Sequence, residues 1–246
     1  MLLRIVAASL LSSVGSIAVA SLLLALPERV RRTVIPWSLS YATGTLLGAA
    51  FLGLIPGALE RLPALPVLGT TLGGMVLFFG LEKVVLWRHA GHDAPAGQQA
   101  AGALVLVGDG LHNFVDGVVL AGAFLTGTAL GVAATVAVVA HEIPHEMGDF
   151  AILLDSGYSR ARALVFNTLS GLVALVGALV AYLALESVRG AVPHILALSA
   201  ASFLYIAAAD LIPSLHRQPG LAAALGQLLL LLLGIATVAS VELSGH

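Results

Sequence analysis

The chain has 246 residues, of which 59% are hydrophobic and only 10% are charged. Soluble domains carry about 25% charged residues, so this chain has too few polar groups to cover a water-exposed surface, and lipid is the solvent that its composition predicts. The net charge of −2 argues against nucleic acid as a partner. The lack of cysteine excludes disulfides and thiolate metal sites, so any metal would need histidine, carboxylate, amide or backbone ligands.

Proline, glycine and charged residues divide the chain into eight apolar segments, each close to the ~20 residues that a helix needs to cross a bilayer. The predicted transmembrane helices cover residues 4–26, 36–58, 66–88, 101–125, 129–154, 162–185, 193–214 and 221–243. Because the connections between them are short, we expect an all-α bundle of eight transmembrane helices that forms one domain over residues 1–246.

The first segment has some features of a signal peptide, with Arg4 before an apolar run and small residues at 18–20. The apolar run continues to Ala25, which is longer than the usual core of a signal peptide. We therefore expect a retained first helix.

Lysine and arginine are distributed unevenly between the two sides of the predicted bundle. Eight lie on the side of the even connections and three on the side of the termini, or seven against three if Lys83 is counted inside its helix. Because the cytoplasmic loops of membrane proteins carry an excess of lysine and arginine, both termini should face outside and the connection Arg88–Gln99 should be cytoplasmic. The composition of that connection, with His89, His92 and Asp93, is typical of disorder.

Two of the predicted helices end in similar sequences. Phe51-Leu52 precedes Ile55-Pro56 in the second helix, and Phe203-Leu204 precedes Ile212-Pro213 in the seventh. An inverted repeat of helices 1–3 and 6–8 would account for this similarity. The spacing within the two segments differs, so the similarity alone does not establish a repeat.

Polar residues gather on one face of the fourth predicted helix. Residues three and four apart are neighbours on a helix surface, so this helix presents four of them together: Asp109, His112, Asn113 and Asp116. The fifth predicted helix has a second such face, formed by His141, Glu142, His145, Glu146 and Asp149. Pro144 lies within this face and is expected to kink the helix and free the carbonyl of Ala140.

Ionisable groups at membrane depth cost ~2.5–3.5 kcal/mol each on insertion scales, so this cluster requires partners, water or a bound cation. Imidazole and carboxylate together suit zinc and its neighbours in the periodic table. The number of donors would allow two ions, with Glu142 and His145 as bridging ligands.

Two other interpretations remain open from these residues. His141-Glu142-Ile143-Pro144-His145 matches HExxH, in which two histidines bind zinc and the glutamate is a general base, so an intramembrane zinc protease is an alternative. A metal sensor that binds without transport is another. The ligand-rich second helix argues against a hydrolytic site, which usually has three protein ligands and an open position.

The chain resembles the ZIP (Zrt-/Irt-like) family of divalent metal transporters over essentially its full length. His112–Gly117 resembles the fourth-helix motif HNxxDG of the family, and His141–Asp149 resembles the fifth-helix motif HEIPHELGD, with Met147 in place of leucine. Weaker similarities to the third and seventh helices of the family lie at residues 81–89 and 202–213.

The resemblance implies a transport domain that moves Zn²⁺, or Cd²⁺, Fe²⁺ or Mn²⁺, into the cytoplasm and that is not an enzyme. It implies a primary metal site of His112, His141 and His145 and a second site of Asn113, Asp116, Glu142 and His145. It also implies both termini outside, an elevator-like movement and frequent homodimers. The short loops favour a bacterial inner-membrane protein.

Some positions depart from the family pattern. The second helix has no side-chain donor in residues 52–57, so the primary site lacks one ligand there. Pro213 is followed by serine where the family often has glutamate, and Asp210 just before it is a further candidate for the metal pathway. Asn167 and Ser170 of the sixth helix could line the metal pathway, but we favour a packing role, because small and polar residues commonly fill contacts between membrane helices.

Overall fold

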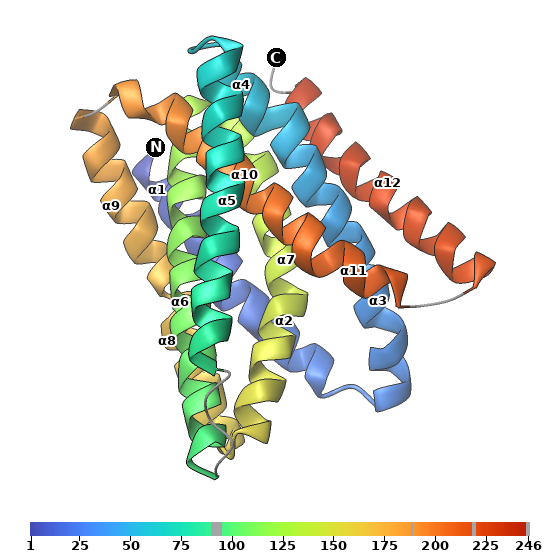
Figure 1. Cartoon of the computed structure of the whole chain (residues 1–246). Coiled ribbons are helices and arrows are strands. Elements are labelled where there is room, and N and C mark those ends of the chain that lie inside the picture. Colours follow the sequence, from blue (N-terminus) through green and yellow to red (C-terminus); the bar gives the residue numbers. More distant parts are fainter. Residues whose placement is uncertain (90–94, 188, 218–219, 245–246) are drawn as a thin grey trace.

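The computed structural model of the chain describes residues 1–89, 95–187, 189–217 and 220–244, and this part of the chain is helical with no strand (Figure 1). The elements are α1 (Leu2–Leu10), η1 (Leu11–Gly15), α2 (Ser16–Leu24), α3 (Glu28–Gly48), η2 (Ala49–Leu54), α4 (Ile55–Leu59), α5 (Ala64–His89), α6 (Pro95–Thr126), α7 (Thr128–Asp155), α8 (Arg160–Gly171), α9 (Val173–Ser187), η3 (Arg189–Ala191), α10 (Val192–Ile206), η4 (Ala207–Leu211), α11 (Ile212–His216) and α12 (Leu221–Ser244). The all-helical class that the sequence predicts is therefore confirmed.

Seven helical segments of the described residues are long and apolar enough to cross a membrane. They are Leu2–Leu24, Pro36–Leu59, Ala64–Leu81, Val105–Thr126, Arg160–Ala184, Val192–His216 and Leu221–Leu243. Helix α7 is long enough to be an eighth, but the histidines and acids of its second half make it too polar to meet the same criterion. The count of eight therefore stays a prediction.

Two boundaries that we predicted at or near a proline differ from the structure. Helix α3 begins at Glu28 and continues through Pro36, where the second helix was predicted to begin. Helix α6 begins at Pro95, so residues 95–99, which we expected to be disordered, are helical. Proline is favoured in the first helical turn, where its missing N–H has no helical partner to lose. His92 and Asp93 of the same connection lie outside the described residues.

Two π-helical turns occur at matching places in the second and seventh spans. The turn η2 directly precedes Ile55-Pro56, and the turn η4 directly precedes Ile212-Pro213. Proline cannot donate a backbone hydrogen bond to the preceding turn, and π turns commonly accommodate such breaks in a helix. The shared feature fits the predicted inverted repeat, which remains a prediction.

Glycine allows two pairs of helices to cross with their backbones in contact. A Cβ atom at Gly117 of α6 would collide with the carbonyl oxygen of Ala174 in α9, and one at Gly177 of α9 would collide with that of Phe114. In the same way, a Cβ at Gly44 of α3 would collide with the backbone of α12. Close approach through small residues is the usual way in which membrane helices associate.

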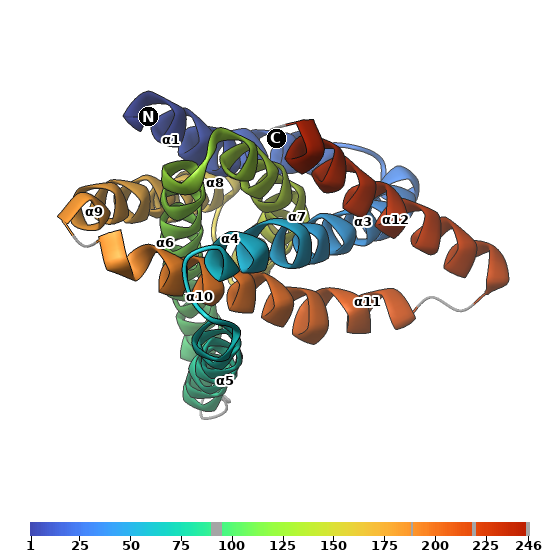
Figure 2. The same ribbon diagram turned by 90° about the horizontal axis from the view of Figure 1, so that it is seen from above.

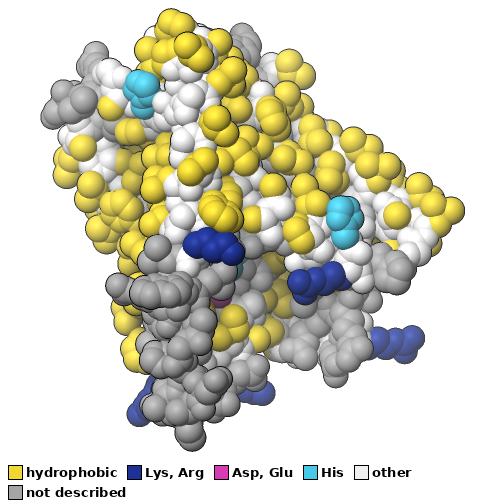
Figure 3. All heavy atoms as spheres, in the orientation of Figure 1, with side chains coloured by type: hydrophobic (Ala, Val, Ile, Leu, Met, Phe, Trp, Pro, Cys, Tyr) yellow, Lys and Arg dark blue, Asp and Glu magenta, His cyan; other side chains and the backbone are white. Residues whose placement is uncertain are grey.

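Helices α6 and α7 form an antiparallel hairpin with one residue, Gly127, between them, and they lie at the centre of the bundle (Figures 1 and 2). Helix α7 contacts α2, α3, α6, α8 and α12. Helices α5 and α12 lie at the periphery and expose leucine and phenylalanine, for example Leu72, Phe79 and Leu229. Figure 3 shows that hydrophobic side chains cover most of this face of the molecule, as a lipid environment requires.

Candidate metal centre

The predicted polar face of α6 points into the bundle. Asp109, Asn113 and Asp116 are buried, whereas the side chain of His112 is 17% exposed. The amide nitrogen Nδ2 of Asn113 donates to Oδ1 of Asp109 at 2.8 Å and contacts the backbone carbonyl of the same residue at 3.2 Å. Asn113 therefore orients Asp109, and this contact directs its amide NH₂ group away from any cation.

The polar face of α7 that lies opposite α6 is also largely buried. His141, Glu142, Glu146 and Asp149 are buried, whereas the side chain of His145 is 41% exposed. The Nδ1 atom of His141 lies 3.0 Å from the carbonyl oxygen of Ala137. Because a carbonyl can only accept a hydrogen bond, Nδ1 is the donor in this contact, and Nε2 is the ring nitrogen that faces α6. A histidine held in this way is prepared to bind a metal ion.

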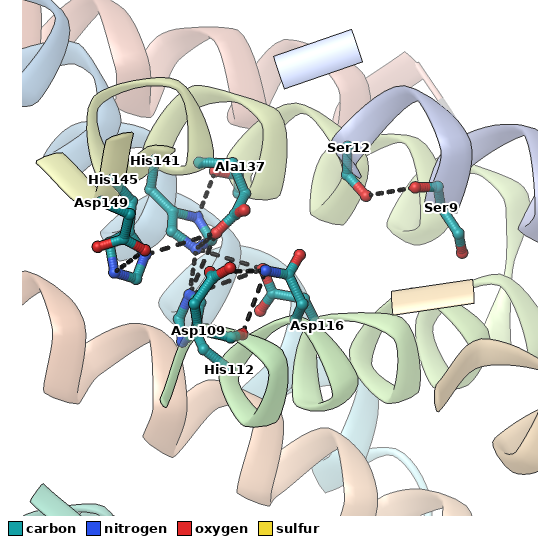
Figure 4. Close-up of polar contacts among 11 residues, drawn as sticks. Ser9, Ser12, Asp109, His112, Asp116, Ala137, His141, His145 and Asp149 are labelled. Atoms are coloured by element: carbon teal, nitrogen blue, oxygen red, sulfur yellow. Dashed lines mark hydrogen bonds and ion pairs between the residues drawn. The ribbon is translucent and has the colours of Figure 1, made fainter. Parts of the chain in front are cut away.

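One set of donors, which we call the histidine group, consists of His112, Asp116, His141 and Glu142. One atom from each lies within 4.8 Å of the others. The Nε2 atoms of the two histidines are 3.2 Å apart. Nε2 of His141 lies 3.3 Å from Oδ2 of Asp116, and Nε2 of His112 lies 3.3 Å from Oε1 of Glu142. Figure 4 shows His112 and Asp116 of α6 pointing toward His141 of α7.

A second set, which we call the carboxylate group, consists of Asp109, Glu142 and Glu146, with one oxygen from each within 4.8 Å of the others. Glu142 thus belongs to both groups. His145 lies at the exposed edge, with Nδ1 3.8 Å from Oε1 of Glu142 and Nε2 3.8 Å from Oδ2 of Asp149. The structure thus brings together every predicted site residue of α6 and α7, while the side chain of Asp210 lies outside the described residues.

Several of the converging oxygen atoms have no hydrogen-bond partner among the described residues. They are Oδ2 of Asp109, both carboxylate oxygens of Asp116, both of Glu142, Oε1 of Glu146 and Oδ2 of Asp149. Buried polar atoms are nearly always paired, and a buried charge is costly unless it is paired or binds a metal. The donor set therefore fits one or two divalent cations.

Asn167 of α8 is a member of this site that the sequence analysis assigned to packing. Its amide nitrogen donates to Oε2 of Glu146, and its own Oδ1 is buried without a partner in the described part of the chain. Asn167 and Glu146 are 21 residues apart and lie on different helices. No local pattern could have revealed the contact, since periodicity predicts only neighbours on one helix. Ser170 of the same helix donates to the backbone carbonyl of Leu106 at 3.0 Å.

The fold and the site define a multi-pass membrane protein with a buried cluster of metal-binding side chains between two of its helices. Residues 87–242 match the family described as "ZIP Zinc transporter", which is more than half of the chain. The chain therefore belongs to the ZIP family, as the two helix motifs indicated.

Individual relatives agree with this assignment. The chain is 38% identical to the human zinc transporter ZIP10 over 117 residues, which is 48% of this chain and 14% of ZIP10. It is 36% identical to the zinc transporter foi of Drosophila melanogaster over 144 residues, or 58% of this chain and 20% of foi. The similarity to the zinc transporter ZIP13 of Pongo abelii is broader, with 34% identity over 216 residues that cover 81% of this chain and 64% of ZIP13. The chain thus spans only a small part of ZIP10 and foi.

Proposed function

We propose that the protein transports zinc, or a similar divalent ion such as Cd²⁺, Fe²⁺ or Mn²⁺, across a membrane into the cytoplasm. The single observation that carries this proposal is the cluster of histidines and buried carboxylates between α6 and α7, in a chain that belongs to the ZIP family. Such a cluster is too costly in a membrane to serve only as packing.

The substrate ions would bind in two adjacent positions. Each group defined above would hold one ion, with Glu142 as a ligand of both. The primary position would use His112, His141 and Asp116, and the exposed His145 would be the ligand that exchanges most readily with water. Zinc is favoured over iron and manganese at a site of nitrogen and oxygen donors by the general order of metal affinities.

Movement of the site would follow the packing of the helices. Helices α6 and α9 form one pair with a glycine contact, and α3 and α12 form another. These two tight pairs support an elevator-like movement in which the hairpin α6–α7, which carries the site, moves together with α9 against the pair α3–α12. We also propose that the protein forms a homodimer, as its resemblance to the ZIP family implies.

The proposed direction of transport rests on the distribution of lysine and arginine between the two ends of the bundle. In Figure 3 the visible lysine and arginine side chains lie on the lower half of the molecule, toward the end where α6 begins. This distribution supports a cytoplasmic location for that end, with both termini outside. The bacterial inner membrane is the location that we propose.

Zinc uptake into sealed liposomes that contain the purified protein tests this function directly. We expect saturable flux in the wild type and a loss of roughly tenfold or more in His145→Ala, because a ligand of the substrate is removed. His194→Ala is the matched control, since this exposed histidine pairs with Thr70 on other helices and should not affect flux.

Equal flux in wild type and His145→Ala would contradict the assigned site. A complete absence of flux above empty liposomes, with zinc still bound, would contradict transport itself. In that case cleavage of a peptide by the wild type and its loss in Glu142→Gln would favour the protease interpretation of the HExxH sequence.

A further inference from the structure

A hollow of about 420 Å³ lies where the ends of α2, α7 and α8 meet. Helix α7 ends at Asp155 and α8 begins at Arg160, and these two ends lie together at the bottom of the bundle in Figure 1. The three helices contact one another. We call the hollow the three-helix pocket, after the segments 21–25, 150–154 and 160–164 that contribute its lining. Its volume is within the ~300–1,000 Å³ that is typical of small-molecule sites.

The pocket exists because each of the three segments presents an alanine to it. Ala25 directly follows α2, Ala151 belongs to α7 and Ala161 belongs to α8, and all three are exposed. Since protein interiors rarely contain voids larger than a water molecule, three short side chains in one place leave a space that larger residues would fill. Phe150 and Leu164 add to the apolar walls. These walls suit a hydrocarbon chain.

A single cationic side chain borders these apolar walls. Arg160, in the first turn of α8, is the only charged residue among the described residues that line the pocket. Its side chain is exposed, so it can reach a ligand that enters from the surface. A guanidinium group binds a phosphate through two parallel hydrogen bonds. The pocket therefore fits a molecule that joins an anionic phosphate to a hydrocarbon chain.

The position of the pocket along the bundle agrees with its chemistry. It lies at the end toward which the visible lysine and arginine side chains gather in Figure 3, and which we propose is cytoplasmic. The cytoplasmic leaflet carries anionic lipids, and basic pockets between transmembrane helices on that side bind their head groups. A free phosphate would make no use of the apolar walls, whereas an anionic phospholipid would use both parts of the pocket.

A second hollow on the other side of α8 provides a contrast. It has a volume of about 460 Å³ and lies between α6, α8 and the start of α9, with Val107, Phe166 and Val173 in its lining. No charged side chain is found among its described lining residues. Lipid chains can fill this groove without any preference for a head group, so it serves as an internal control for the three-helix pocket.

We propose that the three-helix pocket binds one anionic phospholipid, with the phosphate at Arg160 and an acyl chain along the walls that contain the alanines. The bound lipid fills the space between the end of α2 and the end of α7. It thereby joins the first span to the helix that carries His141 and Glu142. The inference is independent of the proposed transport function, because lipid binding is measured without zinc.

Native mass spectrometry of the full chain in detergent micelles tests the proposal. The purified protein is freed of lipid and then offered equal amounts of phosphatidylglycerol and phosphatidylcholine with identical acyl chains. We expect each chain to retain one phosphatidylglycerol molecule in preference to phosphatidylcholine. Equal retention of the two lipids would overturn the proposal.

Two arginines of α8 form a matched pair of substitutions. Arg160→Gln should lower the affinity for phosphatidylglycerol by roughly fivefold or more, as the loss of one cationic group near an anionic lipid predicts. Arg162→Gln should leave the affinity unchanged, because residues two apart face different sides of a helix and Arg162 does not line the pocket. Both side chains are exposed, so neither change disturbs the core. Equal losses in the two variants would mean that the lipid responds to surface charge in general.

Ala161→Phe fills the pocket and keeps the arginine, so it should abolish retention of the lipid. Val107→Phe, which fills the uncharged groove, is the control and should have no effect. Retention of phosphatidylglycerol by Ala161→Phe at the level of the wild type would exclude the pocket as the binding site.

Glycerol phosphate separates a lipid from a free anion, because it carries the phosphate without acyl chains. We expect no competition between glycerol phosphate and bound phosphatidylglycerol at equal concentrations. Displacement of the lipid under these conditions would mean that the apolar walls take no part in binding, and the lipid proposal would fail.

Discussion

Glu142 has the largest number of neighbours among the candidate ligands. Its carboxylate lies within reach of His112, His141 and His145, and it is shared by the two donor groups. It is buried, yet the ion pairs described for it involve histidine and no lysine or arginine. A divalent cation bound between the helices would compensate the charge of this carboxylate.

Replacing Glu142 by glutamine keeps the shape of the side chain and removes its charge. At a free zinc concentration of 100 times the dissociation constant, bound zinc should stabilise the wild type against thermal unfolding by about 2.7 kcal/mol. We expect Glu142→Gln to lose most of this stabilisation at the same zinc concentration, because both groups lose a ligand.

Thermal unfolding with and without zinc measures this effect. Glu60→Gln serves as the control, because Glu60 is exposed at the end of α4. A zinc-dependent stabilisation of Glu142→Gln equal to that of the wild type would remove Glu142 from the site.

The sequence could predict the side chains that share one helix but not those that meet from different helices. The spacing of Asp109, His112 and Asp116 was enough to place them on one face. The contact between Asn167 and Glu146 depends on how α8 approaches α7, which is set by packing across the whole bundle. The division of the ligands into two groups likewise depended on distances between helices.

Among the helices, the glycine contacts define the pairs that must stay together. The pair α6–α9 carries the α6 half of the site, and its backbones touch at Gly117 and Gly177. A larger residue at either position would push α9 away from α6. Because protein interiors are close-packed, such a displacement would extend to neighbouring contacts.

Gly117→Val should destabilise the protein by about 1–3 kcal/mol or more, because its side chain would overlap the backbone of α9. Gly108→Ala on the same helix is the control, since a Cβ there meets no atom within 4 Å. This change should be neutral or stabilising by up to about 1 kcal/mol, since alanine is the better helix former.

Thermal unfolding in detergent compares the two variants. Equal stability of Gly117→Val and the wild type would mean that the α6–α9 crossing is not tight in the membrane.

Helix boundaries were predicted well where an apolar run ends and less well at proline. The span from Pro36 matches the apolar segment, but the helix itself begins eight residues earlier at Glu28. Hydropathy measures the part of a helix that suits lipid, while the helix continues as long as its backbone bonds are satisfied. Pro56 and Pro213 follow the π-helical turns η2 and η4, but a proline alone does not distinguish a π turn from a kink in the sequence.

For the complete bundle, the distribution of lysine and arginine predicts which end faces the cytoplasm. Because the chain has no cysteine, a single introduced cysteine would be the only thiol that a labelling reagent can modify. Pro27 lies between α2 and α3, and Gly190 lies between α9 and α10 at the opposite end of the bundle. Both residues are exposed.

Pro27→Cys and Gly190→Cys should react differently with a maleimide that cannot cross membranes. In intact cells we expect Gly190→Cys to be labelled, and Pro27→Cys to be labelled only after the membrane is made permeable. The reverse pattern would invert the proposed orientation.

The short turn at Gly127 also has a consequence for how the protein is made. Helix α7 carries four acidic residues, so its entry into the bilayer as a single segment would be costly. Because only one residue separates it from α6, the two helices can leave the ribosome in succession and enter the membrane together as a hairpin. Their acids and histidines then face each other instead of lipid from the start, and the same residues that bind the substrate favour insertion of α6 and α7 as one unit.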